Sequence, residues 1–200
     1  LNPLIQEGIE KRKPAHEITP WILGRWSPRA MSGESMTDEE LMPLFEAARW
    51  APSSYNGQPW RFVYAKRDTP HFDVFFNLLV EWNRLWAGKA AALVLVIARK
   101  NFEHNEKTSP THAFDTGAAW ENLALEGARR NLIVHGMEGF DYEKARTVLK
   151  IPDVFEILAM VAIGKRGRKE DLPLKAQEGE SPSNRRPLQE IIMEGMFQAR

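Results

Sequence analysis

The chain has 200 residues, of which 43% are hydrophobic and 27% are charged, so one globular domain with a substantial core is expected. The 27 Lys and Arg residues balance the 27 Asp and Glu residues, and a zero net charge does not indicate a nucleic-acid partner. Cysteine is absent, which excludes disulfides and thiolate metal sites. The longest apolar run, residues 90–98, is too short to cross a bilayer, and no signal-peptide pattern opens the sequence. A cytoplasmic protein without a membrane partner is therefore expected.

The first elements are an arm and a well-marked helix. Residues 1–20 are expected to form an N-terminal arm or a short surface helix, which Pro14 and Pro20 interrupt. A helix is predicted over 37–50, because Thr37 and Glu40 have the spacing of a capping box. Its apolar face at helical spacing comprises Leu41, Leu44, Phe45 and Ala48, with Met42 as a further candidate.

The core elements alternate between strands and helices. Strands are predicted at "WRFVYAK" (60–66), "AALVLVIA" (91–98), "LIVHGM" (132–137) and "ILAMVAIG" (157–164). Helices are predicted over 71–86, 112–131 and 141–150, and the second has a face of small residues that lets a neighbour approach closely. Residues 165–186 lose apolar periodicity and are interpreted as an arm that lies on a partner subunit, followed by a final helix over 187–197. This order predicts a three-layer α/β or α+β core.

The stretch "A-P-S-S-Y-N-G-Q-P-W" (51–60) is the first candidate site. It places Ser53, Ser54, Asn56 and Gln58 between two apolar elements, with a proline near each end. A row of short hydroxyl and amide groups can pair the polar edge of a buried ligand. No nucleophile-elbow pattern surrounds the serines, and the five histidines share no metal-ligand spacing, so neither a nucleophilic serine nor a metal site is predicted.

Three further segments could bind a ligand. In "R-W-S-P-R", Arg25, Ser27 and Arg29 share one side of an extended chain and could grip a phosphate, although a solvated loop is an equal alternative. In "H-G-M-E-G-F-D" (135–141), two glycines allow close approach of a flat ligand, and the alternative is a plain strand-to-helix turn. "S-N-R-R-P-L" ends the long arm with Arg185 and Arg186 and by itself is a charged linker.

The ordered set of these motifs resembles the FMN-dependent nitroreductase family, over about residues 25–197. The resemblance implies an α+β fold, a three-layer sandwich with a mostly antiparallel central sheet. It also implies an intertwined homodimer with two sites at the interface. Residues 21–200 would form a single FMN-binding domain that includes a C-terminal arm over 165–200. No family feature matches residues 1–20.

The resemblance also implies roles for individual residues. The phosphate and ribityl chain of FMN would be held by Arg25, Trp26, Ser27, Arg29 and Arg185. Pro52, Ser53 and Ser54 would border the flavin from the partner subunit, and Asn56 and Gln58 would contact the ribityl chain and ring edge. Asn83 would contact the polar edge of the ring. Gly136, Met137, Glu138 and Gly139 would pass flavin N5, with the backbone N–H of Glu138 facing that nitrogen. The family often has a lysine where this chain has Ser183, and Arg186 or Lys165 are the candidates to replace its charge.

The implied function is an NAD(P)H-dependent flavin oxidoreductase. NADH or NADPH would reduce the flavin, and the flavin would pass electrons to a small acceptor such as a nitroaromatic, a quinone or an enal. No side chain would be catalytic, because the cofactor carries the chemistry. Two alternatives stay open. One is a flavin-fragmenting, dehalogenating or dehydrogenase activity on the same scaffold, and the other is a non-catalytic flavin-binding dimer. The sequence does not choose between NADH and NADPH.

Overall fold

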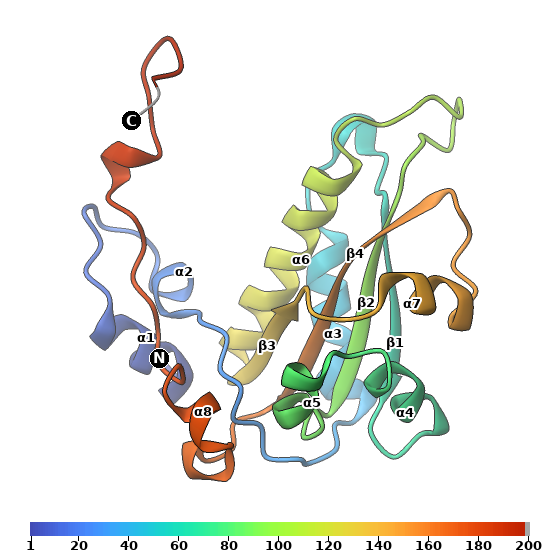
Figure 1. Ribbon diagram of the computed structural model, residues 1–200. Coiled ribbons are helices and arrows are strands. Elements are labelled where there is room, and N and C mark those ends of the chain that lie inside the picture. The colour runs from blue at the N-terminus through green and yellow to red at the C-terminus, as the bar shows by residue number, and fades with distance from the viewer. Residues whose placement is uncertain (199–200) are drawn as a thin grey trace.

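A four-stranded sheet forms the centre of the molecule in the computed structural model, which describes residues 1–198 (Figure 1). The strands are β1 (Trp60–Lys66), β2 (Ala92–Arg99), β3 (Leu132–Met137) and β4 (Phe155–Lys165). Their order in the sheet is β1-β2-β4-β3, and all three neighbouring pairs are antiparallel. The predicted α+β fold with an antiparallel sheet is confirmed.

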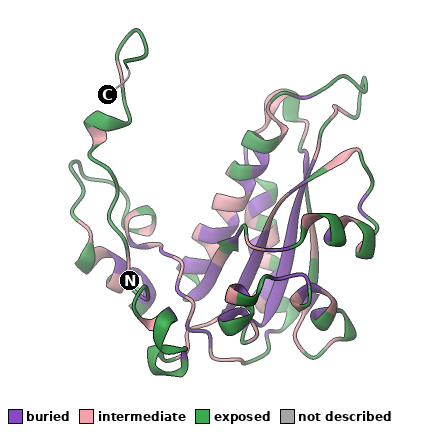
Figure 2. Ribbon diagram, viewed as in Figure 1, coloured by how far each residue is buried: buried purple, intermediate pink, exposed green. Residues whose placement is uncertain are grey.

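Helices cover both faces of this sheet, so the predicted three layers are also confirmed. One face carries α3 (Asp38–Arg49) and α6 (His112–Arg129), and the other carries α4 (Pro70–Phe76), α5 (Glu81–Ala87) and α7 (Tyr142–Val148). The strands between the layers are the most buried part of the chain (Figure 2), and seven of the eight β2 residues are buried. A strand buried on both faces has the continuous apolar run that predicted it.

Helix α3 forms as its sequence predicts. The Thr37 side chain accepts a hydrogen bond from Glu40 N, and the Glu40 side chain accepts one from Thr37 N, which completes the capping box. Leu41, Leu44 and Ala48 are fully buried, whereas Met42 lies outside this face and is exposed. The cap and the apolar stripe together therefore fix where this helix begins and which face it buries.

The prediction of one continuous helix over 71–86 is wrong, because the chain forms α4 and α5 with a break between them. At the break, Val80 N donates to Gly139 O and Asp141 N donates to Leu78 O. Leu78 and Leu79 are buried there. Pairing with the segment after β3 thus replaces the helical hydrogen bonds that the local periodicity would have continued.

The final helix predicted over 187–197 is also wrong, because only the single turn η3 (Leu188–Glu190) forms. Before it, the C-terminal arm holds the short turn η2 (Lys169–Asp171) and the helix α8 (Leu174–Gln177) and is otherwise irregular. Residues 187–198 are almost all exposed, so the apolar residues there have no core that would stabilise a helix.

The N-terminal arm is a helix that docks on the domain. Helix α1 (Pro3–Lys11) packs against α2 (Pro20–Gly24) through two glycines, because a Cβ on Gly8 would lie 2.0 Å from Gly24 O. Leu4 and Ile5 of α1 pack with Trp26 and with Ala128 of α6 in a small separate cluster. The N- and C-terminal arms run side by side along one edge of the molecule (Figure 1).

The fully buried carboxylate of Glu180 joins the C-terminal arm to the segment that follows α2. Its oxygens accept hydrogen bonds from Arg29 N and Ala30 N at 2.9–3.1 Å, and they form an ion pair with Arg166. Arg166 also reaches Glu7 of α1 at 3.4 Å and lies over the Trp26 ring. Three segments that are distant in the sequence therefore meet at one carboxylate, and Arg166 links α1 to them as a fourth.

We expect Glu180→Gln to lower the free energy of unfolding by about 3–5 kcal/mol, because it removes one partner of a buried ion pair and leaves Arg166 without its closest carboxylate. Urea denaturation would measure the change. The matched control is Glu178→Gln, two residues earlier on the exposed side of the arm. Equal stability of the two variants would contradict the role given to Glu180.

Candidate functional site

Four arginines line a small pocket between the two arms and β3. Its volume is about 260 Å³, and its lining includes Arg12, Arg25, Trp26, Ser27, Arg29, His135, Ser183 and Arg185. The structure thus brings together the predicted phosphate ligands of "R-W-S-P-R" and Arg185, which lies 156 positions after Arg29. The pocket also contains residues that the sequence motifs did not indicate.

The predicted arginines differ in how many of their groups are already paired. Arg25 Nε lies 3.3 Å from Glu121 Oε1 of α6. Arg185 Nη1 donates to Ser183 Oγ and to two backbone carbonyls of its own arm. The backbone N–H of Arg29 is held by Glu180, but its guanidinium has no hydrogen bond or ion pair within residues 1–198, and its Nε is buried. Arg29 is therefore the guanidinium most ready to take an anion.

Arg12 is a pocket residue that the sequence analysis missed. It follows α1, and its Nη1 donates to Leu23 O at 2.7 Å and Arg25 O at 2.6 Å, while its Nε donates to Ser183 O at 2.9 Å. Burial, together with the charges of Arg185 and Arg25, lowers the pKa of Arg12 from its usual value. No local signal indicates this role, because the contact with Ser183 joins residues 171 positions apart.

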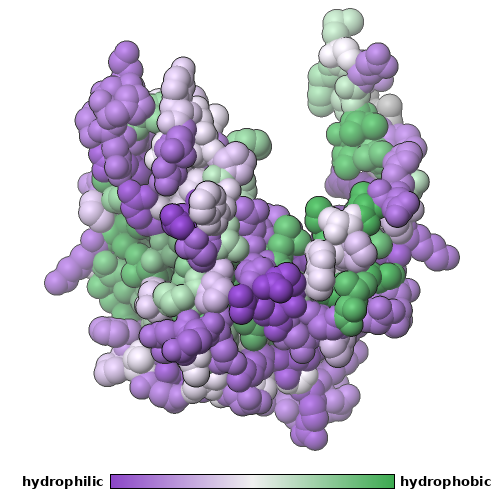
Figure 3. Space-filling model, turned by 180° about the vertical axis from the view of Figure 1, so that it is seen from behind, coloured by the Kyte–Doolittle hydropathy of each residue, from purple (hydrophilic) through white to green (hydrophobic). Residues whose placement is uncertain are grey.

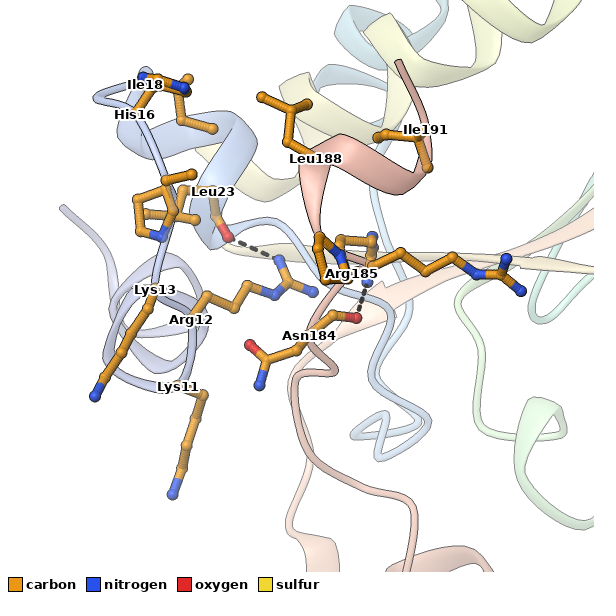
Figure 4. A pocket seen from close by; sticks show the side chains of 14 residues that line it. Lys11, Arg12, Lys13, His16, Ile18, Leu23, Asn184, Arg185, Leu188 and Ile191 are labelled. Carbon is orange, nitrogen blue, oxygen red and sulfur yellow. Dashed lines mark hydrogen bonds between the residues drawn. The ribbon is translucent and has the colours of Figure 1, made fainter. Parts of the chain in front are cut away.

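The two residues predicted to replace the missing lysine lie elsewhere. Lys165 Nζ lies 3.1 Å from Glu40 Oε1 and 3.6 Å from Glu34 Oε2, so acidic groups at the start of α3 already hold it. Arg186 lines a larger neighbouring groove of about 760 Å³ between the arms and does not line the arginine pocket. Arg12 and Arg185 line both spaces, and Figure 4 shows the Arg12 side chain reaching from its arm toward the C-terminal arm.

His135 opens the predicted 135–141 segment and lines the pocket, although the sequence analysis gave its side chain no role. Its Nδ1 lies 2.9 Å from Pro28 O, and its ring packs against Trp86 at 4.5 Å. Burial lowers the pKa of His135 from its usual value, and the positive charge of Arg29 acts in the same direction. The lowered pKa favours the uncharged ring, and Nδ1–H is the donor to Pro28 O because a carbonyl can only accept.

The "G-M-E-G" segment ends β3 and lies against α5. Asn83 of α5 is buried, and its Nδ2 donates to Gly139 O at 2.9 Å, so these two predicted site residues are in contact. Neither Gly136 nor Gly139 has a positive φ, so this segment does not need glycine for a left-handed turn. Gly139 is needed for space instead, because a Cβ there would lie 2.8 Å from Asn83 Nδ2 and 2.9 Å from Val80 Cγ2.

The serine-rich loop after Pro52 lies at the opposite end of the sheet from the arginine pocket. It leads into Trp60, which pairs with Ala98 at the end of β2, whereas the segment after Arg29 pairs with Arg166 just beyond the end of β4. Ser53 Oγ accepts from Gln58 N, and Ser54 N donates to Asp115 of α6. Three residues of the loop, Tyr55, Asn56 and Gln58, have positive φ. The loop therefore has a defined but strained backbone conformation, and it does not reach the arginine pocket of its own chain.

Unpaired buried polar atoms gather around the pocket. Five such side-chain atoms occur in residues 1–198, and four of them are Trp26 Nε1, Arg29 Nε, Trp86 Nε1 and Trp120 Nε1. Trp26 and Arg29 line the pocket, Trp86 packs on His135, and the Trp120 indole lies against Gly136. Buried N–H groups without partners are rare in folded proteins, and a group of them indicates a place where a ligand supplies the acceptors.

No metal site competes with this interpretation, since no three acidic or imidazole side chains within residues 1–198 come together as ligands. Over the same residues, no helix combines the length and apolar character needed to cross a bilayer. The pocket is therefore best described as an anion-binding site with unpaired N–H donors beside it.

Comparisons with known proteins agree with the fold and the motifs. A model of the nitroreductase family matches residues 22–165. The chain resembles a crystal structure of an oxidoreductase containing FMN, with a TM-score of 0.90 and 42% identity over 94% of this chain and 97% of that one. It is 31% identical over 183 residues to Protein DrgA of Synechocystis sp., covering 78% of this chain and 85% of that protein.

A putative nitroreductase in complex with FMN from Desulfovibrio desulfuricans shares the fold, with a TM-score of 0.69 and 24% identity over 99% of both chains. The family match covers more than half of this chain and includes all four strands of the sheet and the helices between them, from α3 to β4. The chain belongs to the nitroreductase family.

Proposed function

We propose that the arginine pocket holds the phosphate of FMN and that the chain is an NAD(P)H-dependent flavin oxidoreductase. Solved relatives are described as an oxidoreductase containing FMN and as NAD(P)H nitroreductases, which supports this assignment. The observation that carries it is the set of four arginines around about 260 Å³, with the buried Nε of Arg29 unpaired. Guanidinium groups placed in this way recognise a phosphate dianion.

The chain's own residues would bind and orient the cofactor. Arg25, Ser27, Arg29 and Arg185 would pair the phosphate, and the neutral His135 would border it without adding charge. The bound flavin would supply the electron transfer itself. From the pocket, the ring would extend toward the "G-M-E-G" segment, where Gly136 leaves the Trp120 indole close to the backbone.

At the polar edge of the ring, Asn83 and Glu138 have separate roles. Asn83 is fixed by its bond to Gly139 O, which leaves its amide oxygen available as an acceptor. The backbone N–H of Glu138 would donate to flavin N5, so the carboxylate is not required for the reaction. On this proposal the reaction needs no general base from the chain, and the space above the ring would determine the acceptor, such as a nitroaromatic, a quinone or an enal.

The serine-rich loop would complete the site from a second copy of the chain. Its polar groups face a separate hollow at the far end of the sheet, so only a partner could place them at the arginine pocket of this chain. Large apolar side chains are exposed beside it, Trp50 at 73% and Phe114 at 79%. Seen from behind (Figure 3), a wide gap separates the arms from the body, and hydrophobic residues gather along the arms beside it. A homodimer would cover these surfaces.

Purified protein should carry FMN, which its visible absorption spectrum would reveal, and NADH or NADPH should bleach that spectrum.

Arg29→Ala should weaken FMN binding by about 1.5–3 kcal/mol, the usual contribution of a hydrogen bond to a charged group. The guanidinium has no other bond in residues 1–198, so its loss tests ligand binding rather than folding. Arg168→Ala, at a side chain 79% exposed, is the control. A protein that cannot be reconstituted with FMN would overturn the proposal.

Glu138→Gln should keep most of the rate of flavin reduction, because a backbone N–H serves N5 whatever the side chain is. Gly139→Val should lose FMN and stability together, since its Cβ would collide with Asn83 and Val80. Stopped-flow reduction by NADH or NADPH measures the first effect, and thermal unfolding measures the second. If Glu138→Gln binds FMN but is reduced a thousandfold more slowly, the carboxylate is catalytic.

The dimer is tested at Gly117 of α6, where a Cβ would meet nothing within 4 Å in the described chain. Gly117→Arg should leave the protomer folded, because arginine favours helix more than glycine does. It should nevertheless shift the protein from dimer to monomer in sedimentation at micromolar concentration. Thr147→Arg, exposed on α7 of the opposite layer, is the control. A parent protein that sediments as a folded monomer would contradict the homodimer.

A further inference from the structure

We propose that Arg12 is itself a ligand of the bound phosphate. Its charge would replace that of the lysine which the family often has at the position of Ser183. This inference rests on the proposed function, in which the arginine pocket takes a phosphate. It gives a binding role to the N-terminal arm, which precedes the region matched by the family model. The arm would then be part of the site rather than an appendage.

The position of Arg12 is fixed before any ligand arrives. Three backbone carbonyls, from Leu23, Arg25 and Ser183, accept its Nη1 and Nε hydrogens at 2.6–2.9 Å. These bonds use the two hydrogens of Nη1 and the one of Nε. The Nη2 group has no hydrogen bond or ion pair within residues 1–198, so two of the five N–H donors remain available. A guanidinium held in this way loses little freedom when it binds an anion.

The positive charges around Arg12 also favour the binding of an anion. Arg25 has Glu121 at 3.3 Å, whereas no carboxylate lies within ion-pair distance of Arg12, Arg29 or Arg185 among the described residues. The other nearby acid, Glu180, is occupied by Arg166 and by backbone N–H groups. The lowered pKa of Arg12 reflects burial and the two like charges beside it. A phosphate with up to two negative charges would relieve this repulsion.

The alternatives for the missing lysine fail on geometry. Lys165 is paired with Glu40 and Glu34, and Arg186 lines only the larger groove. Lys11 and Lys13, the neighbours of Arg12, line the larger groove (Figure 4) and do not line the arginine pocket. Arg12 is the added cation that the arginine pocket itself contains.

A purely structural role is the competing explanation, because the same three bonds brace the arms. Comparing FMN with riboflavin separates the two, since riboflavin has the same ring and ribityl chain but no phosphate. Arg12→Gln keeps a hydrogen-bond donor for the carbonyls and removes the charge. We expect it to reduce FMN affinity by roughly 10- to 100-fold, the range for a hydrogen bond to a charged group, with riboflavin affinity unchanged. Lys13→Gln, exposed on the same arm, should change neither affinity.

Fluorescence titration of the apoprotein with each flavin gives the result. Equal losses for FMN and riboflavin would make Arg12 a brace only and overturn the inference. A parent protein that binds both flavins equally would instead show that no phosphate is recognised, which is a failure of the proposed function.

As a second measurement that needs no variant, inorganic phosphate should protect Arg12 of the apoprotein from an arginine-specific dicarbonyl reagent, read by mass spectrometry. Absence of protection would also overturn the inference.

Discussion

The buried carboxylate of Glu180 is the interaction on which the geometry of the anion site depends. A charge without solvent is stable only if its oxygens are fully paired, and this one takes two backbone N–H groups and Arg166. Those partners belong to the segment after α2 and to the end of β4. Their pairing fixes the path of the backbone at Arg29 and brings the C-terminal arm, with Arg185, to the same place. Through Arg166 and Glu7, α1 is tied to the same point.

The sheet divides the polar motifs between its two ends. The arms and the "G-M-E-G" segment gather at one side, and the serine-rich loop is held at the other by Asp115 and by its own turn. In the proposed homodimer, this separation would explain why one chain contains every motif but does not bring them to one pocket. The loop is strained at three residues with positive φ, as segments that bind a ligand or a partner often are.

Several features could be predicted from the sequence because their causes are local. The capping box and apolar stripe of α3, the double-sided burial of β2 and the membership of Arg25, Ser27 and Arg29 in one pocket all follow from spacing within a few residues. The failures have long-range causes. The break between α4 and α5 depends on hydrogen bonds to residues 139 and 141, and the space required at Gly139 depends on Asn83 and Val80, not on backbone conformation.

The sequence by itself therefore determined the elements, the layers and the family motifs, because periodicity, caps and short motifs act over one or two turns of chain. Only the tertiary structure decided which cations share the pocket. Ser183 removes one charge, and nothing in the local sequence shows that Arg12 lies opposite it, 171 residues away. Lys165 and Arg186 carry the same charge and were equally plausible along the chain. The acidic partners of Lys165 and the place of Arg186 outside the pocket are set by folding, since electrostatic interactions depend on distance in space and on burial.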